Sequence, residues 1–361
     1  MHGLFKTKMF SIEYKFQETF DVILMHLLNF LEISTMKYIE IMSSLFLCIS
    51  MTNDQSIFRF RLMAKTFDIC DHVMVGHAVA DDWQEHTRLA LLLSQSLYKS
   101  KRFDASDVMS RYLNFYHHSK CNIGETTRLV YEELLTNVPA TSTTLTRKDF
   151  IFTVQQIYDA SHSAHKKLND LSAGCNPVQR SFPLAFCPWI EDQSLFHISC
   201  AEARLTHYSP LPGQVAGVMN VICRRLFKGD HWNEAVKAGF SSTLNVLDEI
   251  QEIQQRYEHD QFLKSTGHPA YAPNTLHTAL HCVARAESFE NALELAKKIE
   301  PQYCPLLVAV LAGARWIVPQ SMLGNCPKDV LSDIHKVAKS FNDEWDKSHG
   351  KNKNFFKKIF S

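Results

Sequence analysis

The sequence lacks an excess of charge of either sign. Its 361 residues include 38 lysines and arginines and 38 aspartates and glutamates, so the formal net charge is zero. A nucleic acid or an anionic membrane surface attracts proteins through a basic excess, which this chain does not have. The composition therefore predicts no nucleic-acid partner, and an anionic ligand would have to be held by local groups.

Paired cysteines are also missing. The ten cysteines contain no C-x-x-C pair and stand singly, most of them in apolar surroundings such as "LFLCISM" and "LHCVAR". This distribution is typical of reduced, buried thiols and not of a disulfide framework. The spacings of common zinc sites are absent as well. These features predict a cytoplasmic protein.

No uninterrupted apolar run is long enough to span a bilayer, which takes about 18 residues or more. Residues 20–51 are very hydrophobic, but acidic, basic and histidine side chains interrupt them. The first ten residues also lack the pattern of a secretory signal. We therefore expect buried helices in this region and no membrane span, with a membrane anchor as the alternative interpretation.

Alternating β patterns are scarce, and neither a P-loop nor a G-x-G-x-x-G string occurs. Apolar residues instead recur at helical spacing, and no fixed-period repeat is present. The pattern predicts an all-α protein. Helices are expected at residues 86–100, 103–118, 213–227 and 243–260, together with two helices in 275–299 that join at "RAES".

The stretch "ADDWQEHTRLAL" could carry chemistry. Asp82, Glu85 and His86 stand at positions i, i+3 and i+4, so they share one face of a first helical turn. One interpretation is that Asp81 or Asp82 caps this helix, where a carboxylate also suits the helix dipole. The other is a site for a hard cation such as Mg²⁺, which prefers carboxylate oxygens.

Two further stretches mix polar, glycine and proline residues in an unusual way. "GCNPVQR" covers residues 174–180, and "LTHYSPLPG" places Thr206 and His207 before a helix that prolines open. The simplest interpretation is a turn at the first, with Arg180 paired to a surface acid, and a capping or packing histidine at the second. Both gain a functional meaning if the two stretches converge.

Four motifs together resemble one family. "NIGETTR", "SAGCNPVQRSFPLAF", "ISCAEARLTHYSPL" and "LAGARW" have an order and spacing similar to the ADP-ribosylglycohydrolases, over roughly residues 70–325. That family includes dinitrogenase-reductase-activating glycohydrolases, mammalian ADP-ribose hydrolases and the jellyfish J1 crystallins. The resemblance implies a single compact, orthogonal, all-α domain. Its loops at 81–86, 174–180, 206–211 and 299–304 should meet at one cleft.

The resemblance also implies a division of the chain. It assigns residues 1–60 to a divergent helical segment and 61–330 to the family domain. Residues 331–361 would form a C-terminal helix and a basic tail.

The same resemblance implies a metal-dependent hydrolase that cleaves N- or O-glycosidic ADP-ribosyl linkages, with ADP-ribose or an ADP-ribosylated protein as partner. Water would attack at the anomeric carbon beside two Mg²⁺ or Mn²⁺ ions. The implied site residues are Glu85 and Asp82 for catalysis, Asp81, Asp82, Glu85 and Glu300 for metal, and Gly174, Asn176, Thr206 and His207 for the ligand.

The chain departs from the family at both metal strings. The T-D-D-T string of the family falls on Gln84–Thr87, and G-G-D-x-D-T falls on "KIEPQYC", with Glu300 and the neutral Gln302 at the aspartate positions. Two alternatives to the enzyme therefore remain. One is a non-catalytic binder of ADP-ribose, and the other is a structural protein like the crystallins.

Overall fold

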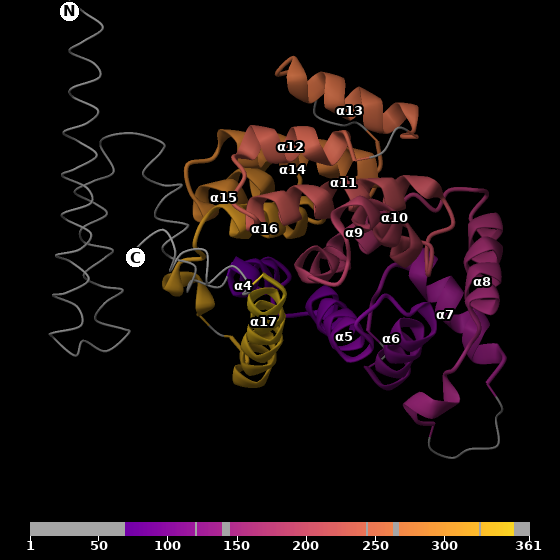
Figure 1. Cartoon of the computed structure of the whole chain (residues 1–361). Coiled ribbons are helices and arrows are strands. Elements are labelled where there is room, and N and C mark those ends of the chain that lie inside the picture. The colour runs from indigo at the N-terminus through magenta and orange to yellow at the C-terminus, as the bar shows by residue number, and fades with distance from the viewer. Residues whose placement is uncertain are drawn as a thin grey trace, which may run out of the picture. The chain divides into compact units, whose positions relative to one another are not determined.

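The structure is a computed structural model that describes residues 69–119, 121–138, 145–242, 245–262, 267–324 and 326–349. Within them lie fourteen α-helices and three short 3-10 helices but no strand, and one isolated backbone bridge joins Gly174 to Tyr271 (Figure 1). The all-α prediction is confirmed. The elements are α4 (Ile69–Ala80), α5 (Glu85–Ser100), α6 (Ala105–Ser119), α7 (Glu125–Thr136), η1 (Arg147–Asp149), α8 (Val154–Lys167), α9 (Asn176–Arg180), η2 (Phe182–Phe186), α10 (Asp192–Ala203), α11 (Pro210–Phe227), α12 (Trp232–Phe240), α13 (Asp248–Glu258), α14 (Ala272–Arg285), α15 (Phe289–Ile299), α16 (Cys304–Arg315), η3 (Gln320–Leu323) and α17 (Lys328–His349).

Most of the predicted helices are present close to their predicted bounds. α5, α6 and the pair α14 and α15 match, and the two helices of the pair are separated at the "RAES" stretch. α11 begins earlier than predicted, at Pro210, because a proline without an N–H is well tolerated in a first helical turn. α13 begins later than predicted, at Asp248. The predictions for residues 1–60 and for the tail after residue 349 lie outside the described residues.

Helices α11 and α16 form the centre of the core. Every residue of α16 from Cys304 to Ala314 is buried, as are most residues of α11. α16 packs against α4, α14 and α15, and α11 packs against α10 and α12. A helix that is apolar on all sides is expected in such an interior position. These two helices therefore fix the frame on which α4 and α10 hold their polar residues.

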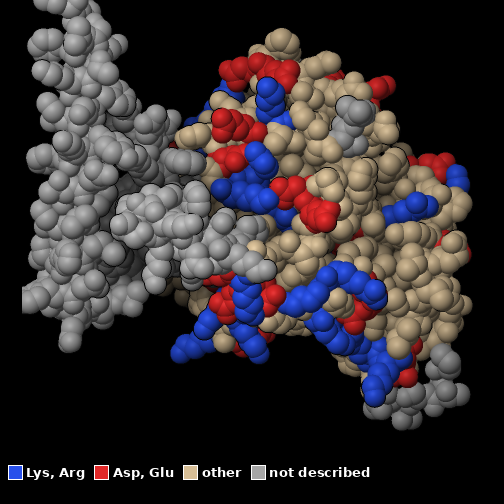
Figure 2. All heavy atoms as spheres, viewed as in Figure 1, with Lys and Arg blue, Asp and Glu red and all other residues tan. Residues whose placement is uncertain are grey.

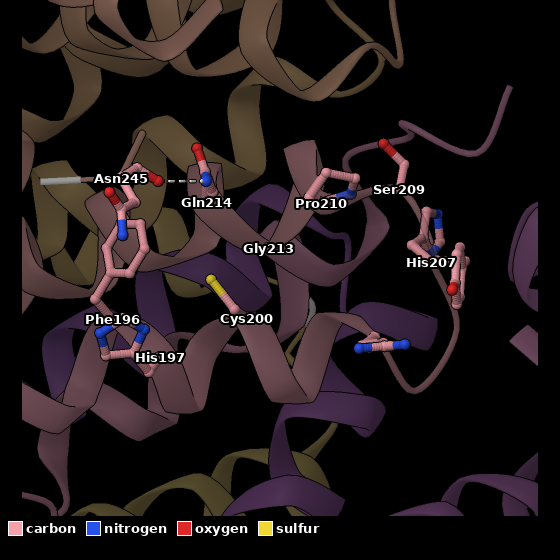
Figure 3. Close-up of a pocket in the computed structure, with 11 residues that line it drawn as sticks. Phe196, His197, Cys200, His207, Ser209, Pro210, Gly213, Gln214 and Asn245 are labelled. Carbon is pink, nitrogen blue, oxygen red and sulfur yellow. Dashed lines mark hydrogen bonds between the residues drawn. The ribbon is translucent and has the colours of Figure 1, made fainter. Parts of the chain in front are cut away.

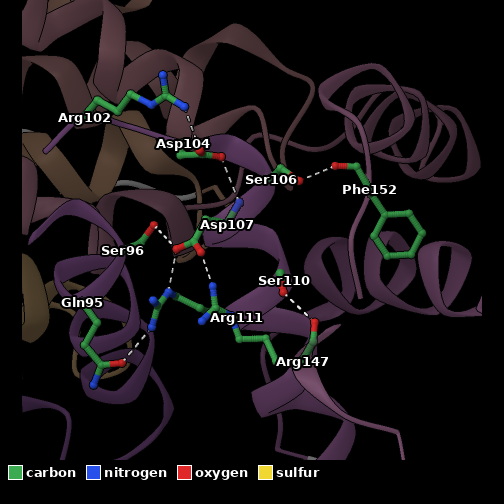
Figure 4. A network of polar contacts seen from close by, with 10 residues as sticks. All are labelled: Gln95, Ser96, Arg102, Asp104, Ser106, Asp107, Ser110, Arg111, Arg147 and Phe152. Carbon is green, nitrogen blue, oxygen red and sulfur yellow. Dashed lines mark hydrogen bonds and ion pairs between the residues drawn. The ribbon is translucent and has the colours of Figure 1, made fainter. Parts of the chain in front are cut away.

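A polar network fixes the first turn of α6 to its neighbours (Figure 4). The carboxylate of Asp107 accepts hydrogen bonds from Ser96 at 2.6 Å and from Arg111 Nε at 2.8 Å, and it also pairs with Arg147. The Asp104 carboxylate accepts the Asp107 backbone N–H at 3.0 Å and so caps the start of α6. The network ties α5 to α6 and η1.

The surface carries charges of both signs. On the face in Figure 2, lysine and arginine side chains gather toward the lower part, with aspartate and glutamate side chains among them. Among the described helices, none combines the length and the apolar character needed to cross a membrane.

Candidate active site

Asp81 follows the last turn of α4 and caps the start of α5. Its Oδ2 accepts the backbone N–H of Thr87 at 2.7 Å and the Thr87 hydroxyl at 2.8 Å, and its Oδ1 lies 3.2 Å from His86 Nδ1. The side chain is only 6% exposed. The predicted cap by Asp81 is therefore confirmed, and both carboxylate oxygens are engaged by the protein itself.

These contacts make Asp81 a source of pH-dependent stability. Burial alone would raise the pKa of Asp81, but the hydrogen bond from His86, the nearby His77 and the Thr87 N–H outweigh it and lower the pKa. Because the folded-state pKa lies below the unfolded value of about 3.9, the stabilisation is complete above that value. It is lost as the pH falls through the lower folded-state pKa.

Asp81→Asn tests this contribution. We expect the variant to lose about 1–2 kcal/mol of unfolding free energy at pH 7, because an amide replaces a charged cap. Urea unfolding of both proteins from pH 7 to pH 3 should show the difference shrinking as the pH falls. An equal difference at every pH would contradict the account.

Asn176 joins the α5 start to the loop at 174–180. Its Oδ1 accepts a hydrogen bond from Arg180 Nη1 at 2.6 Å. Its Nδ2 lies 3.1 Å from the Ile123 carbonyl and 3.2 Å from His86 Nε2. The predicted meeting of these stretches therefore includes the "NIGETTR" motif, which supplies Ile123.

Arg180 lies at the centre of the site and is fully buried. Its Nε donates to Glu202 Oε1 at 2.8 Å and its Nη2 donates to Thr206 Oγ1 at 3.0 Å. Tyr112 also donates to Glu202 Oε1, at 3.1 Å. The prediction that Arg180 pairs with a surface acid is wrong, because its partner Glu202 is as buried as Arg180 itself.

His207 is the next residue in this chain of contacts. Its Nδ1 lies 2.9 Å from Thr206 Oγ1, and the side chain is almost fully buried. Burial, followed by the positive charge of Arg180, holds the pKa of His207 well below its usual range, so the ring is neutral at physiological pH. A methyl group added to Gly174 would lie 3.3 Å from His207 Nε2, so the Gly174 backbone lies close to this nitrogen.

A pocket of about 390 Å³ opens beside His207, between α10 and the start of α11. In Figure 3, His207 and Ser209 lie at one end, Phe196 and His197 at the other, and Cys200 and Gly213 between them. Arg204 also lines it. Its guanidinium lies 4.7 Å from the Tyr158 ring centroid and 4.9 Å from that of Tyr208.

Glu300 directly follows α15 and lies four residues before the start of α16. Its carboxylate accepts the backbone N–H groups of Gln302, Tyr303 and Cys304 at 2.7–2.9 Å. Gln179 Nε2 donates to the Tyr303 carbonyl at 3.2 Å, so this stretch also reaches the 174–180 loop. The four predicted stretches are therefore joined by contacts, although residues 85–86, 176–180, 210–211 and 304 belong to helices. Of the four, only the 206–211 stretch lines the pocket beside His207.

The four predicted metal ligands do not fit a pair of Mg²⁺ ions. Asp81 caps α5 through Oδ2 and pairs with His86 through Oδ1, while Glu300 uses both carboxylate oxygens on the amides before α16. Asp82 is exposed on a turn with positive φ. Glu85 is half-buried at the start of α5. No cluster of three or more His, Cys, Asp and Glu side chains able to hold a metal occurs in the described ranges. Two Mg²⁺ ions normally need several shared carboxylates.

Three residues of the site were not predicted from the sequence. Glu202 and Arg204 bracket the end of α10, and His77 lies on α4, with its ring centroid 4.7 Å from that of Phe182. Burial lowers the pKa of His77 to about 4. The available signal for Glu202 was a single acid near the apolar residues Leu195, Phe196 and Ala203 of the same helix, which indicates a buried charge that needs a partner.

Comparisons with known proteins agree with this architecture. A solved structure described as an "ADP-ribosylglycohydrolase-related protein complex" has a TM-score of 0.57 and 22% sequence identity to this chain. The match covers 76% of this chain and 97% of that one, so the two share a fold. No curated protein matches the sequence. The family model described as ADP-ribosylglycohydrolase matches residues 50–349, and the chain therefore belongs to the ADP-ribosylglycohydrolase family.

Proposed function

We propose that this protein recognises the ADP-ribosyl group, either free as ADP-ribose or attached to a protein. The observation that carries the proposal is the arrangement around His207. Its Nε2 has no hydrogen-bond partner in the described part of the chain, and it faces the backbone of Gly174, where an added methyl group would lie only 3.3 Å away. A ligand can approach the protein backbone closely at a glycine.

Arg204 is suited to bind an anionic group of the ligand, such as a diphosphate. Its guanidinium rests on the two tyrosine rings, and it has no carboxylate partner among the described residues. Arginine stacked on aromatic rings is pre-organised and binds phosphate oxygens through two parallel N–H groups. The Phe196 and His197 end of the pocket suits a planar ring, since both side chains are aromatic.

Hydrolysis of an ADP-ribosyl N- or O-glycosidic linkage is the second candidate function. Membership of the family supports it, and so does Glu85, whose carboxylate has no partner among the described residues. A carboxylate without a hydrogen-bond partner can act as a general base for water if the linkage to be cleaved binds beside it. If Glu85 has this role, Glu85→Gln should abolish the release of ADP-ribose from arginine- or serine-linked peptides while leaving ADP-ribose binding unchanged.

The expected dependence on Mg²⁺ or Mn²⁺ stays a prediction with its own test. A cation that binds only the folded state would raise the melting temperature, by the equivalent of a few kcal/mol at about 100 times its Kd. The caps made by Asp81 and Glu300 argue for a smaller effect, because a metal would have to displace backbone N–H groups from both carboxylates. Melting curves with and without millimolar Mg²⁺ and Mn²⁺ decide between these outcomes.

Calorimetric titration of ADP-ribose tests the proposed function. We expect binding by the wild-type protein both in EDTA and in Mg²⁺. His207→Leu should weaken it by tenfold or more, since a hydrogen bond to a charged group contributes about 1.5–3 kcal/mol. His207→Gln keeps an N–H donor of similar reach and is the matched control. Absence of ADP-ribose binding under every condition would refute the proposal and favour the crystallin-like alternative.

A further inference from the structure

A chain of hydrogen bonds connects His86 to His207, and Arg180 lies in its middle. Among the described residues of this chain, Arg180 alone can donate but not accept. A guanidinium has five N–H groups and accepts nothing. Its Nη1 and Nη2 donate in two directions, to Asn176 Oδ1 at 2.6 Å and to Thr206 Oγ1 at 3.0 Å. Two arms of hydrogen bonds therefore start at Arg180, one through Asn176 to His86 and one through Thr206 to His207. Because Arg180 only donates, the donor and the acceptor of each later hydrogen bond follow in turn.

The first arm ends at His86. Because Arg180 only donates, the Asn176 atom that it contacts must be the oxygen, and the Ile123 carbonyl confirms that the other atom is nitrogen. Asn176 Nδ2 therefore also donates to His86 Nε2, which must be unprotonated. The proton of His86 then lies on Nδ1, which donates to Asp81 Oδ1 at 3.2 Å.

The second arm ends at His207. The Thr206 oxygen accepts from Arg180, and among the described residues its hydroxyl proton has no acceptor other than His207 Nδ1, at 2.9 Å, so the hydroxyl donates there. A neutral imidazole that accepts at Nδ1 carries its proton on Nε2. That nitrogen faces Gly174, as described above, and has no protein partner in the described ranges.

We infer that Arg180 orders His86 and His207 in opposite tautomers, so that His207 presents an N–H donor and the ligand group that meets it is an oxygen acceptor. Thr206 is the positioning residue that transmits this order to His207. The identity of the ligand rests on the proposed function, in which that oxygen belongs to the diphosphate or a ribose of the ADP-ribosyl group. The tautomers themselves are a property of the free protein.

Nitrogen NMR of the full chain with ¹⁵N-labelled histidine tests the inference directly, with His86→Gln and His207→Gln used to assign the signals. We expect the free protein to show a protonated Nε2 and an unprotonated Nδ1 at His207, and the reverse at His86. A His207 ring with its proton on Nδ1, or a His86 ring with its proton on Nε2, would overturn the inference. These outcomes are decided without ADP-ribose, so they stand apart from failure of the proposed function.

Thr206→Val and Thr206→Ser separate the positioning role of the hydroxyl from packing. Valine has nearly the shape of threonine but no hydroxyl, so His207 should show averaged tautomer signals and ADP-ribose should bind several-fold more weakly. Serine keeps the hydroxyl and should keep the wild-type signals. Unchanged His207 signals in Thr206→Val would show that Thr206 does not set the tautomer, whatever the variant does to stability. On titration with ADP-ribose, loss of the proton from His207 Nε2 would show that the ligand donates there, contrary to the inference.

Discussion

Replacing Glu202 by alanine is expected to lower the free energy of unfolding by about 3–5 kcal/mol, because it leaves the Arg180 guanidinium buried without a counter-charge. Arg180 and Glu202 are both fully buried, and Glu202 Oε1 accepts from Arg180 Nε and from Tyr112. For a domain of this size the loss corresponds to a fall in melting temperature of roughly 5–8 °C. Thermal and urea unfolding measure it.

Two further variants show whether charge or shape is responsible. Glu202→Gln keeps the shape and one accepting oxygen, so it should cost less than the alanine variant. The double variant Arg180→Met with Glu202→Leu removes both charges and should recover much of the lost stability, since paired apolar replacements of buried ion pairs are often neutral. The double variant also removes the hydrogen-bond donors to Asn176 and Thr206, so it should not bind ADP-ribose even where its stability is recovered. A double variant as unstable as Glu202→Ala would contradict this explanation.

The helices of this protein could be predicted from the sequence because their apolar residues recur at helical spacing. The predicted starts of α11 and α13 differ from the observed starts, because apolar spacing does not specify where the first turn begins. Glu300 shows how far the site could be predicted, since only the family resemblance placed it at a metal position. In the structure the nearest donors to its carboxylate are the amides of the α16 start, three and four residues later. Free N–H groups at a helix start attract a carboxylate without any metal.

The convergence of the motifs was predictable, but the bond pattern that joins them was not. The family motifs placed Asn176, Thr206 and His207 together, and the contacts agree. Nothing in the sequence showed that Arg180 would face inward, because arginine is mostly exposed and the acid that neutralises it stands 22 residues later. A buried charge pair between distant residues depends on how α9 and α10 pack, which periodicity does not specify.

Gly313, in the "LAGARW" motif, should be the most sensitive glycine of the frame. A Cβ at this position would lie 2.9 Å from the His72 carbonyl oxygen and 3.0 Å from Val73 Cα, so α16 touches the backbone of α4. Backbone atoms cannot rotate away as a side chain can. We expect Gly313→Ala to cost about 1–3 kcal/mol, or more, because the two helices must separate. Because Asp81 follows α4, the shift should also weaken its cap on α5.

Gly174→Ala is the matched control, since it adds the same methyl group where only His207 Nε2 lies close, at 3.3 Å. The two variants should therefore change different properties of the protein. Gly313→Ala should lower the melting temperature clearly, whereas Gly174→Ala should change it little and weaken ADP-ribose binding, because its methyl group fills the space in front of the His207 donor. Unfolding curves and calorimetric titration of both proteins distinguish the cases. Equal loss of stability in both would mean that the 174–180 loop is a packing element and that Gly174 is not kept open for a ligand.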